Sequence, residues 1–190
     1  MVEIKRATKE TDICLKLNID GSGKYKIDTK IGFFNHMLES FAKHSFFDIE
    51  LRCDGDIDVD FHHSVEDVGI VLGEALKKSI YPLKNRERFG QALIVMDESA
   101  VESALDLSNR PYLVYDMDLD GKIGNFDAEL IEEFFRAFVF NAKITAHIIK
   151  RRGKNRHHLA EAAFKSLAVA LRRALKTDPK ASIPSTKGMI

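Results

Sequence analysis

The feature that most constrains this sequence is a His-His-x-x-Glu pentapeptide that occurs twice. It spans His62–Glu66 in the first half of the chain and His157–Glu161 in the second. Four of the seven histidines fall in these two pentapeptides, so a chance duplication is improbable on composition alone. The repeat indicates that the chain consists of two halves built on one plan.

The pattern of apolar residues gives both halves the same order of elements. Leu15 and Leu17 alternate with polar residues, as in a half-buried strand, whereas Phe34, Leu38 and Phe41 recur at helical spacing. Each half then reads β-β-β-α-β-α. The expected strands are 2–8, 12–19, 24–28, 46–53, 91–97, 101–107, 111–118 and 143–150, and the expected helices are 33–44, 62–79, 127–141 and 157–175.

We therefore predict an α/β chain of the α+β type with an internal duplication. The first half-repeat spans residues 1–85 and the second spans 86–190, joined through the turn-rich segment Tyr81–Asn85. Each pentapeptide opens the last helix of its half. A repeated order of elements is weaker evidence than repeated sequence, and here a short piece of sequence repeats as well.

Charge and cysteine content narrow the class of protein. The 29 basic and 29 acidic residues balance, whereas a nucleic-acid binder usually shows a basic excess. The N-terminal segment is charged throughout, and no apolar run approaches the roughly 18–20 residues that span a bilayer. Cys14 and Cys53 read as small buried residues in a reducing compartment. We expect a cytoplasmic protein that binds neither nucleic acid nor membrane.

The spacing within each pentapeptide suits metal binding. Side chains four residues apart share a helix face, while adjacent ones point about 100° apart. Each motif should therefore supply a chelating His/Glu pair to one ion and a lone imidazole to a second. His36 and His147 could complete two sites with three imidazoles and one carboxylate each. Such a set tolerates Zn, Fe, Mn or Co, and an octahedral ion would keep two positions open.

Four segments together resemble the imidazoleglycerol-phosphate dehydratase family of histidine biosynthesis, in its monofunctional form. They are Gly32–Leu38, Phe61–Asp67, His157–Glu161 and Pro184–Gly188, and the match runs from Arg6 to the C-terminus. The resemblance implies a four-stranded sheet covered by two helices in each half. It also implies a 24-subunit homo-oligomer with two divalent ions per subunit, manganese being expected, at sites between neighbouring subunits.

The resemblance also assigns roles to individual residues. Glu10 would be the acid/base group, Arg88 and Arg110 would bind phosphate, and Ser185 and Lys187 would be C-terminal substrate contacts. His44 would line the pocket, at the end of the stretch that begins at His36. The implied metal ligands are His36, His62, His63, Glu66, His147, His157, His158 and Glu161.

The implied reaction dehydrates D-erythro-imidazole-glycerol phosphate to imidazole-acetol phosphate. The proton leaves a carbon that is not next to a carbonyl, so the substrate's own imidazole, bound to metal, must be the electron sink. Glu10 would move that proton, while the phosphate contacts fix the geometry.

Two other classes of function stay open from the residues. A two-metal hydrolase would attack a phosphoester or amide with a metal-bound hydroxide, but such sites favour bridging carboxylates. Duplicated small α/β domains also occur in RNA-associated proteins, which the zero net charge and the metal-spaced histidines oppose. An assay that measures both phosphate release and ketone formation separates the hydrolase from the dehydratase. A salt-dependent RNA-binding titration tests the RNA-associated class.

Overall fold

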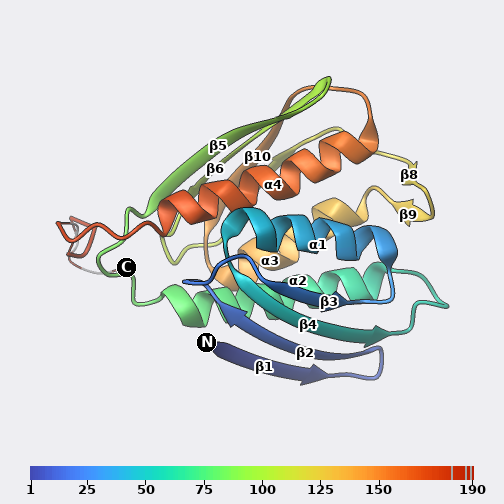
Figure 1. Cartoon of the computed structure of the whole chain (residues 1–190), viewed down its shortest axis with the longest axis horizontal. Coiled ribbons are helices and arrows are strands. Elements are labelled where there is room, and N and C mark those ends of the chain that lie inside the picture. Colours follow the sequence, from blue (N-terminus) through green and yellow to red (C-terminus); the bar gives the residue numbers. More distant parts are fainter. Residues whose placement is uncertain (181, 187, 189) are drawn as a thin grey trace.

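The two halves of the chain form two four-stranded sheets with the same connectivity (Figure 1). The computed structural model describes residues 1–180, 182–186, 188 and 190. The first half consists of β1 (Val2–Ala7), β2 (Thr11–Asn18), β3 (Tyr25–Asp28), α1 (Gly32–Ser45), β4 (Asp48–Gly55) and α2 (His62–Ile80). The second half consists of β5 (Phe89–Met96), β6 (Ser99–Asp106), β7 (Tyr112–Asp116), β8 (Lys122–Ile123), β9 (Phe126–Asp127), α3 (Leu130–Ala142), β10 (Thr145–Arg152) and α4 (Arg156–Ala174).

The strand orders confirm the duplication. The first sheet runs β1-β2-β4-β3 and the second runs β5-β6-β10-β7. In each sheet the last-named pair is parallel and the other pairs are antiparallel. The predicted α+β fold, with two similar halves that each contain a four-stranded sheet and two helices, is therefore confirmed. The half-repeat boundary at residue 85 stays a prediction.

The four helices lie between the two sheets, so the halves share one core (Figure 1). Helix α1 packs on α4, and α2 packs on α3, in each case across the duplication. The α2–α3 approach depends on two glycines, because a Cβ on Gly69 would lie 2.9 Å from the Cβ of Ala137 and one on Gly73 would lie 2.5 Å from Phe138 O. The close packing fixes the helices that begin with the two pentapeptides.

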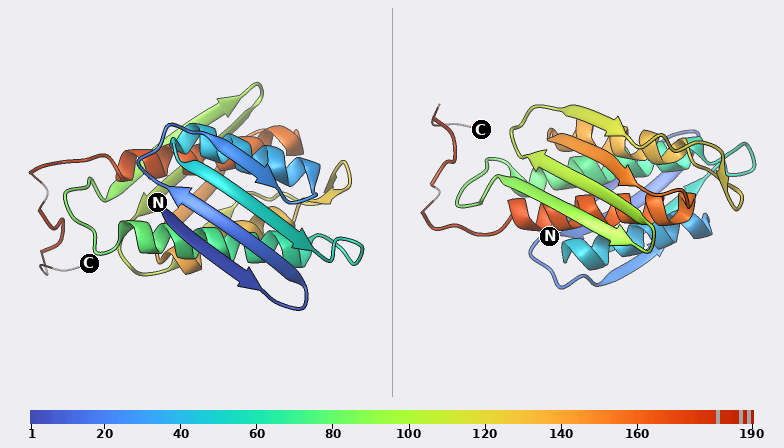
Figure 2. Two further views of the ribbon diagram at one scale, coloured as in Figure 1. Left: turned by 60° about the horizontal axis from the view of Figure 1, so that its bottom comes forward. Right: turned by 90° about the horizontal axis from the view of Figure 1, so that it is seen from above.

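Figure 2 shows the outer face of each sheet, the first sheet in its left view and the second in its right view. The side chains on these two faces differ in character. On the first sheet the outward side chains are charged and paired, as in Lys16 with Glu50 at 3.2 Å. On the second sheet the outward side chains Phe89, Leu93, Val95 and Tyr112 are large, apolar and exposed. The outer face of the first sheet is thus charged and readily hydrated, whereas the outer face of the second sheet exposes apolar side chains.

The structure corrects four details of the predicted elements. A small β8–β9 hairpin was missed, and α3 begins at Leu130 instead of 127, because Gly124 turns the chain with φ 63° and Phe126 is buried against Phe33. Strand β4 begins at residue 48 instead of 46, because α1 ends in a left-handed Phe46. It also continues to Gly55 instead of ending at residue 53, because Gly55 pairs with Thr11.

Within the described residues, the chain has no helix long and apolar enough to cross a membrane.

Candidate metal and substrate site

Each pentapeptide lies in the first turn of its helix, and a preceding polar side chain accepts from its backbone amides. Asp60 Oδ1 accepts from the amide of His62 at 2.7 Å at the start of α2. Asn155 Oδ1 accepts from the amides of His157 at 3.0 Å and His158 at 3.3 Å at the start of α4. These side chains satisfy amides that have no partner within the helix. These hydrogen bonds hold the first turn of each helix, and so the backbone from which each pair of histidines projects.

The two pentapeptides have nearly the same internal geometry. His62 Nε2 lies 3.8 Å from Glu66 Oε2, and His157 Nε2 lies 3.3 Å from Glu161 Oε2. The adjacent rings of each His-His pair are inclined at 84° to one another. The first histidine of each motif therefore shares a face with the glutamate and the second points elsewhere, as the helical spacing predicted.

His36 of α1 joins the second pentapeptide. Its Nε2 lies 3.4 Å from Glu161 Oε2, and one ligand atom each from His36, His157 and Glu161 lie within 4.8 Å of one another. Both imidazoles are partly exposed, whereas Glu161 is buried. Two imidazoles and a carboxylate that converge in this way are a donor set suited to a divalent ion of intermediate hardness, such as Mn, Fe, Co or Zn.

Lys165 holds the second oxygen of Glu161 and was missed from the sequence. Its Nζ lies 2.6 Å from Glu161 Oε1, one helical turn further along α4. Burial raises the pKa of Glu161, but the hydrogen bond and charge of Lys165 outweigh it, so the net pKa lies below its ordinary value. The i, i+4 spacing after Glu161 was the signal that could have found this residue.

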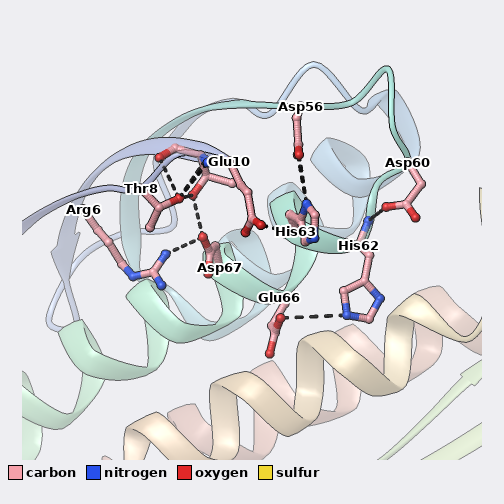
Figure 3. A network of polar contacts seen from close by, with 10 residues as sticks. Arg6, Thr8, Glu10, Asp56, Asp60, His62, His63, Glu66 and Asp67 are labelled. Atoms are coloured by element: carbon pink, nitrogen blue, oxygen red, sulfur yellow. Dashed lines mark hydrogen bonds and ion pairs between the residues drawn. The ribbon is translucent and has the colours of Figure 1, made fainter.

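The second histidine of each motif is oriented by a carboxylate on its Nδ1. His63 Nδ1 lies 3.0 Å from Asp56 Oδ2, and this hydrogen bond raises the pKa of His63 (Figure 3). His158 Nδ1 lies 2.8 Å from Glu98 Oε2, and that contact is the main cause of a lowered pKa at Glu98. With a proton on Nδ1, each ring directs the lone pair of Nε2 outward, as a metal-binding imidazole requires.

Glu10 lies in the β1–β2 turn, against the first pentapeptide (Figure 3). Its Oε1 is 3.8 Å from His63 Nε2, and the side chain is about half exposed. The Glu10 carboxylate therefore faces Nε2 of His63, the ring nitrogen opposite the one that contacts Asp56. The structure thus brings the predicted acid/base residue to a predicted ligand.

The predicted phosphate contacts line a separate cleft of about 570 Å³. Arg88, Arg110 and Ser185 all border it, and Lys187 lies outside the described residues. Arg88 donates to both carboxylate oxygens of Asp106, at 2.6 and 3.0 Å, and to Pro184 O at 2.6 Å. Arg110 is 70% exposed, which leaves its guanidinium accessible to an anion.

This cleft lies at the opposite end of α4 from the histidine cluster. The Arg88 amide donates to Ala174 O at 2.9 Å, at the last residue of α4, whereas His157 is the second residue of that helix. At about 1.5 Å of rise per residue, the two ends are separated by about 25 Å. One copy of the chain therefore does not bring its own arginines to its own cluster.

Two further predicted residues occupy different surroundings. His147 is exposed on β10 between the buried Ala146 and Ile148, so its side chain lies on the outer face of the second sheet, away from the helices. His44, at the end of α1, has a lowered pKa because it is partly buried and lies near Lys165 and Arg172. Among the described residues, the only group of three close ligand atoms is that of His36, His157 and Glu161.

The fold and the side-chain geometry define a duplicated α+β protein with a histidine–carboxylate cluster and a separate cleft that two arginines border. Comparison with known proteins supplies the family. The sequence profile described as imidazoleglycerol-phosphate dehydratase matches residues 29–171. The chain belongs to this family. It is a hydro-lyase, and the family's dehydration reaction serves histidine biosynthesis.

Full-length relatives carry the same description. The imidazoleglycerol-phosphate dehydratase of Nitratiruptor is 72% identical over all 190 residues of both chains, and that of Campylobacter hominis is 63% identical over the same span. A solved structure of the enzyme from Pyrococcus furiosus has a TM-score of 0.86 at 37% identity, covering 98% of this chain and 100% of that one. The Staphylococcus aureus enzyme has a TM-score of 0.82 at 40% identity, covering 92% and 98%.

Proposed function

We propose that the chain dehydrates D-erythro-imidazole-glycerol phosphate to imidazole-acetol phosphate with two divalent metal ions per subunit, manganese being the expected metal. The observation that carries the proposal is the convergence of His36, His157 and Glu161 within 4.8 Å. Family membership supports the dehydration. The metal ions, the residue roles and the substrate follow from the site and from the sequence resemblance.

The donor chemistry fits a metal-assisted reaction. His62, His63 and Glu66 would hold one part of the centre, and His157, His158 and Glu161 the other, with His36 and His147 completing them. Bound divalent ions would act as Lewis acids that make the substrate's imidazole a better electron sink. Asp56 and Glu98 hold the Nδ1 atoms of His63 and His158, so that both Nε2 atoms face outward as ligands.

The protein groups supply proton transfer and position. Glu10 would take the proton from the substrate carbon while the C–O bond on the neighbouring carbon breaks and that hydroxyl leaves, with a proton, as water. Glu10 would then return a proton to carbon when the resulting enol becomes the ketone. Its partly exposed carboxylate is available for both steps, and it lies beside His63. Arg88 and Arg110 would bind the phosphate, and such contacts fix the substrate relative to Glu10.

The separation along α4 supports assembly of several copies. A small substrate does not span about 25 Å, so the arginines of one copy would serve the histidine cluster of another. His147 lies on the outer face of the second sheet, where it is available to a neighbouring subunit. The exposed Phe89, Leu93, Val95 and Tyr112 on that sheet provide apolar surface for contact. We propose a homo-oligomer with shared sites, and the resemblance implies 24 subunits.

A product assay tests this function directly. The purified chain, loaded with Mn²⁺, is incubated with D-erythro-imidazole-glycerol phosphate, and imidazole-acetol phosphate and inorganic phosphate are both measured. We expect the ketone without phosphate release. Release of phosphate without the ketone would contradict the proposal and favour a two-metal hydrolase. Undiminished ketone formation by the wild type after extensive chelation would contradict the metal dependence.

A further inference from the structure

A buried polar network ties the β1–β2 turn to helix α2 (Figure 3). Thr11 Oγ1 donates to Asp67 Oδ2, and the guanidinium of Arg6 forms an ion pair with the same carboxylate. Asp67 is buried and follows Glu66 directly in α2. The network therefore joins the turn that carries Glu10 to the helix that carries the first pentapeptide.

The turn is also held by its own hydrogen bonds. Thr8 Oγ1 accepts from the amide of Glu10 at 3.1 Å and from that of Thr11 at 3.0 Å. The carbonyl of Glu10 accepts from the amide of Asp56 at 3.0 Å. Both backbone polar groups of Glu10 are thus engaged, so the position of its side chain depends on how firmly the turn is attached to the rest of the chain.

The attachment lies one helical turn from the site. His63 and Asp67 are four residues apart in α2 and so share a face of the helix. His63 meets the Glu10 side chain at 3.8 Å, and Asp67 meets the hydroxyl of Thr11, the residue after Glu10. Glu10 and Thr11, which are adjacent in the chain, therefore contact residues that lie one helical turn apart in α2. This register sets the distance between Glu10 and His63.

The second half of the chain shows that the fold does not require this network. The residue after Glu161 is Ala162, which is buried, where Asp67 follows Glu66 in the first half. Glu98 immediately precedes β6 as Glu10 precedes β2. The same packing is thus achieved there without a carboxylate, and a buried ion pair is in general a weak source of stability. The carboxylate occurs in the half that carries Glu10.

We propose that Asp67, acting through Thr11, is a positioning residue that holds Glu10 in place for proton transfer. The inference rests on the proposed function of the chain. Proton transfer requires the base within hydrogen-bond reach of the proton, and a displacement of about 1 Å can lower a rate about 100-fold. A looser turn should reduce kcat, while substrate binding at the arginine cleft and metal content stay unchanged.

The test uses Thr11→Val, which keeps the branched shape and removes the hydroxyl. We expect kcat to fall about 10- to 100-fold, with KM and metal content unchanged. Ser166→Ala is the matched control, because it removes a buried hydroxyl that bonds Ser103 Oγ at 2.7 Å in the second half. It should leave kcat near the wild-type value. If Thr11→Val folds poorly, Asp67→Asn provides the second variant. Deuterium exchange of residues 7–12 should accelerate in Thr11→Val and not in Ser166→Ala.

A double mutant separates positioning from a general structural effect. In a Glu10→Gln background, Thr11→Val should cost no further activity, because the group that it positions is already disabled. An equal fold-loss of kcat in both backgrounds, or a normal kcat in Thr11→Val, would overturn the inference while the proposed function stands. A wild-type chain that forms no ketone, or a Glu10→Gln chain that turns over normally, would overturn the catalytic role of Glu10 and the inference with it.

Discussion

His36 Nε2 lies 3.4 Å from Glu161 Oε2, which joins the first helix of one half-repeat to the last helix of the other. The close packing of α1 on α4 produces this contact, and it places His36 beside His157 as well. The cluster is therefore a product of the duplication, since neither half alone contains all three side chains. The same buried helices that form the core fix the positions of these three side chains.

Substitution of Glu10 by Gln should separate chemistry from binding. The amide keeps the size and polarity of the side chain but does not take and return a proton. We expect kcat to fall on the order of 10²–10⁴-fold, with metal content and KM near those of the wild type. Steady-state kinetics with metal analysis of the same sample measures this. Normal turnover in Glu10→Gln would show that a group other than Glu10 transfers the proton.

Arg110→Ala should act on binding. Its guanidinium is exposed and, among the described residues, its ion pair is a long contact of 3.9 Å with Asp106, so its removal should leave the fold intact. Because a phosphate contact persists from the ground state to the transition state, KM should rise about 10-fold or more while kcat changes little. Lys16→Ala, on the charged outer face of the other sheet, serves as the control. A lowered kcat with an unchanged KM would argue against a phosphate-binding role.

Glu98→Gln should weaken metal binding without removing a ligand. The carboxylate orients His158 and accepts from the amide of Asn155 at 2.8 Å, at the start of α4. Loss of its charge should lower metal affinity about 10- to 100-fold, as for other groups that orient a ligand. Competition with a fluorescent chelator measures the affinity. Glu50→Gln, whose partner is the exposed Lys16, is the matched control, and equal affinities in the two variants would contradict this role.

Leu93→Asp should disrupt assembly. Leu93 is 57% exposed on the outer face of the second sheet, and a charge there would be buried without a partner in an apolar contact. Light scattering should show a smaller particle than for the wild type. Lys16→Glu on the first sheet should leave the mass unchanged. A wild-type chain that is already monomeric, or an unchanged mass in Leu93→Asp, would contradict shared sites on this face.

Periodicity predicted most of the fold and part of the site. Alternation and helical spacing placed the long elements to within about three residues, and the helix starts of both pentapeptides followed from their sequence. The β8–β9 hairpin was missed because two-residue strands have no period, and their position depends on packing of Phe126. Asp56 and Glu98 were also missed, since their contacts with His63 and His158 depend on tertiary geometry. Lys165 was missed although it follows Glu161 at the i, i+4 spacing of a helical ion pair.

The pairing of ligands was only partly predictable. Spacing alone placed His62 beside Glu66 and His157 beside Glu161, and the structure shows both contacts. Metal binding by these pairs stays a prediction. That His36 joins the second motif follows from the packing of α1 on α4, which the sequence does not encode locally. The outward position of His147 follows from strand alternation, and its role as a metal ligand stays a prediction.

The most direct test of the central claim is the metal content of wild type and Glu161→Gln after loading with Mn²⁺ and removal of free ion. Glu161 is buried in the cluster and contacts His36 and His157, so its replacement should remove at least one ion. We predict two bound ions per wild-type chain by elemental analysis and at most one in Glu161→Gln. An equal metal content in both proteins, or a wild type that retains none, would contradict the account.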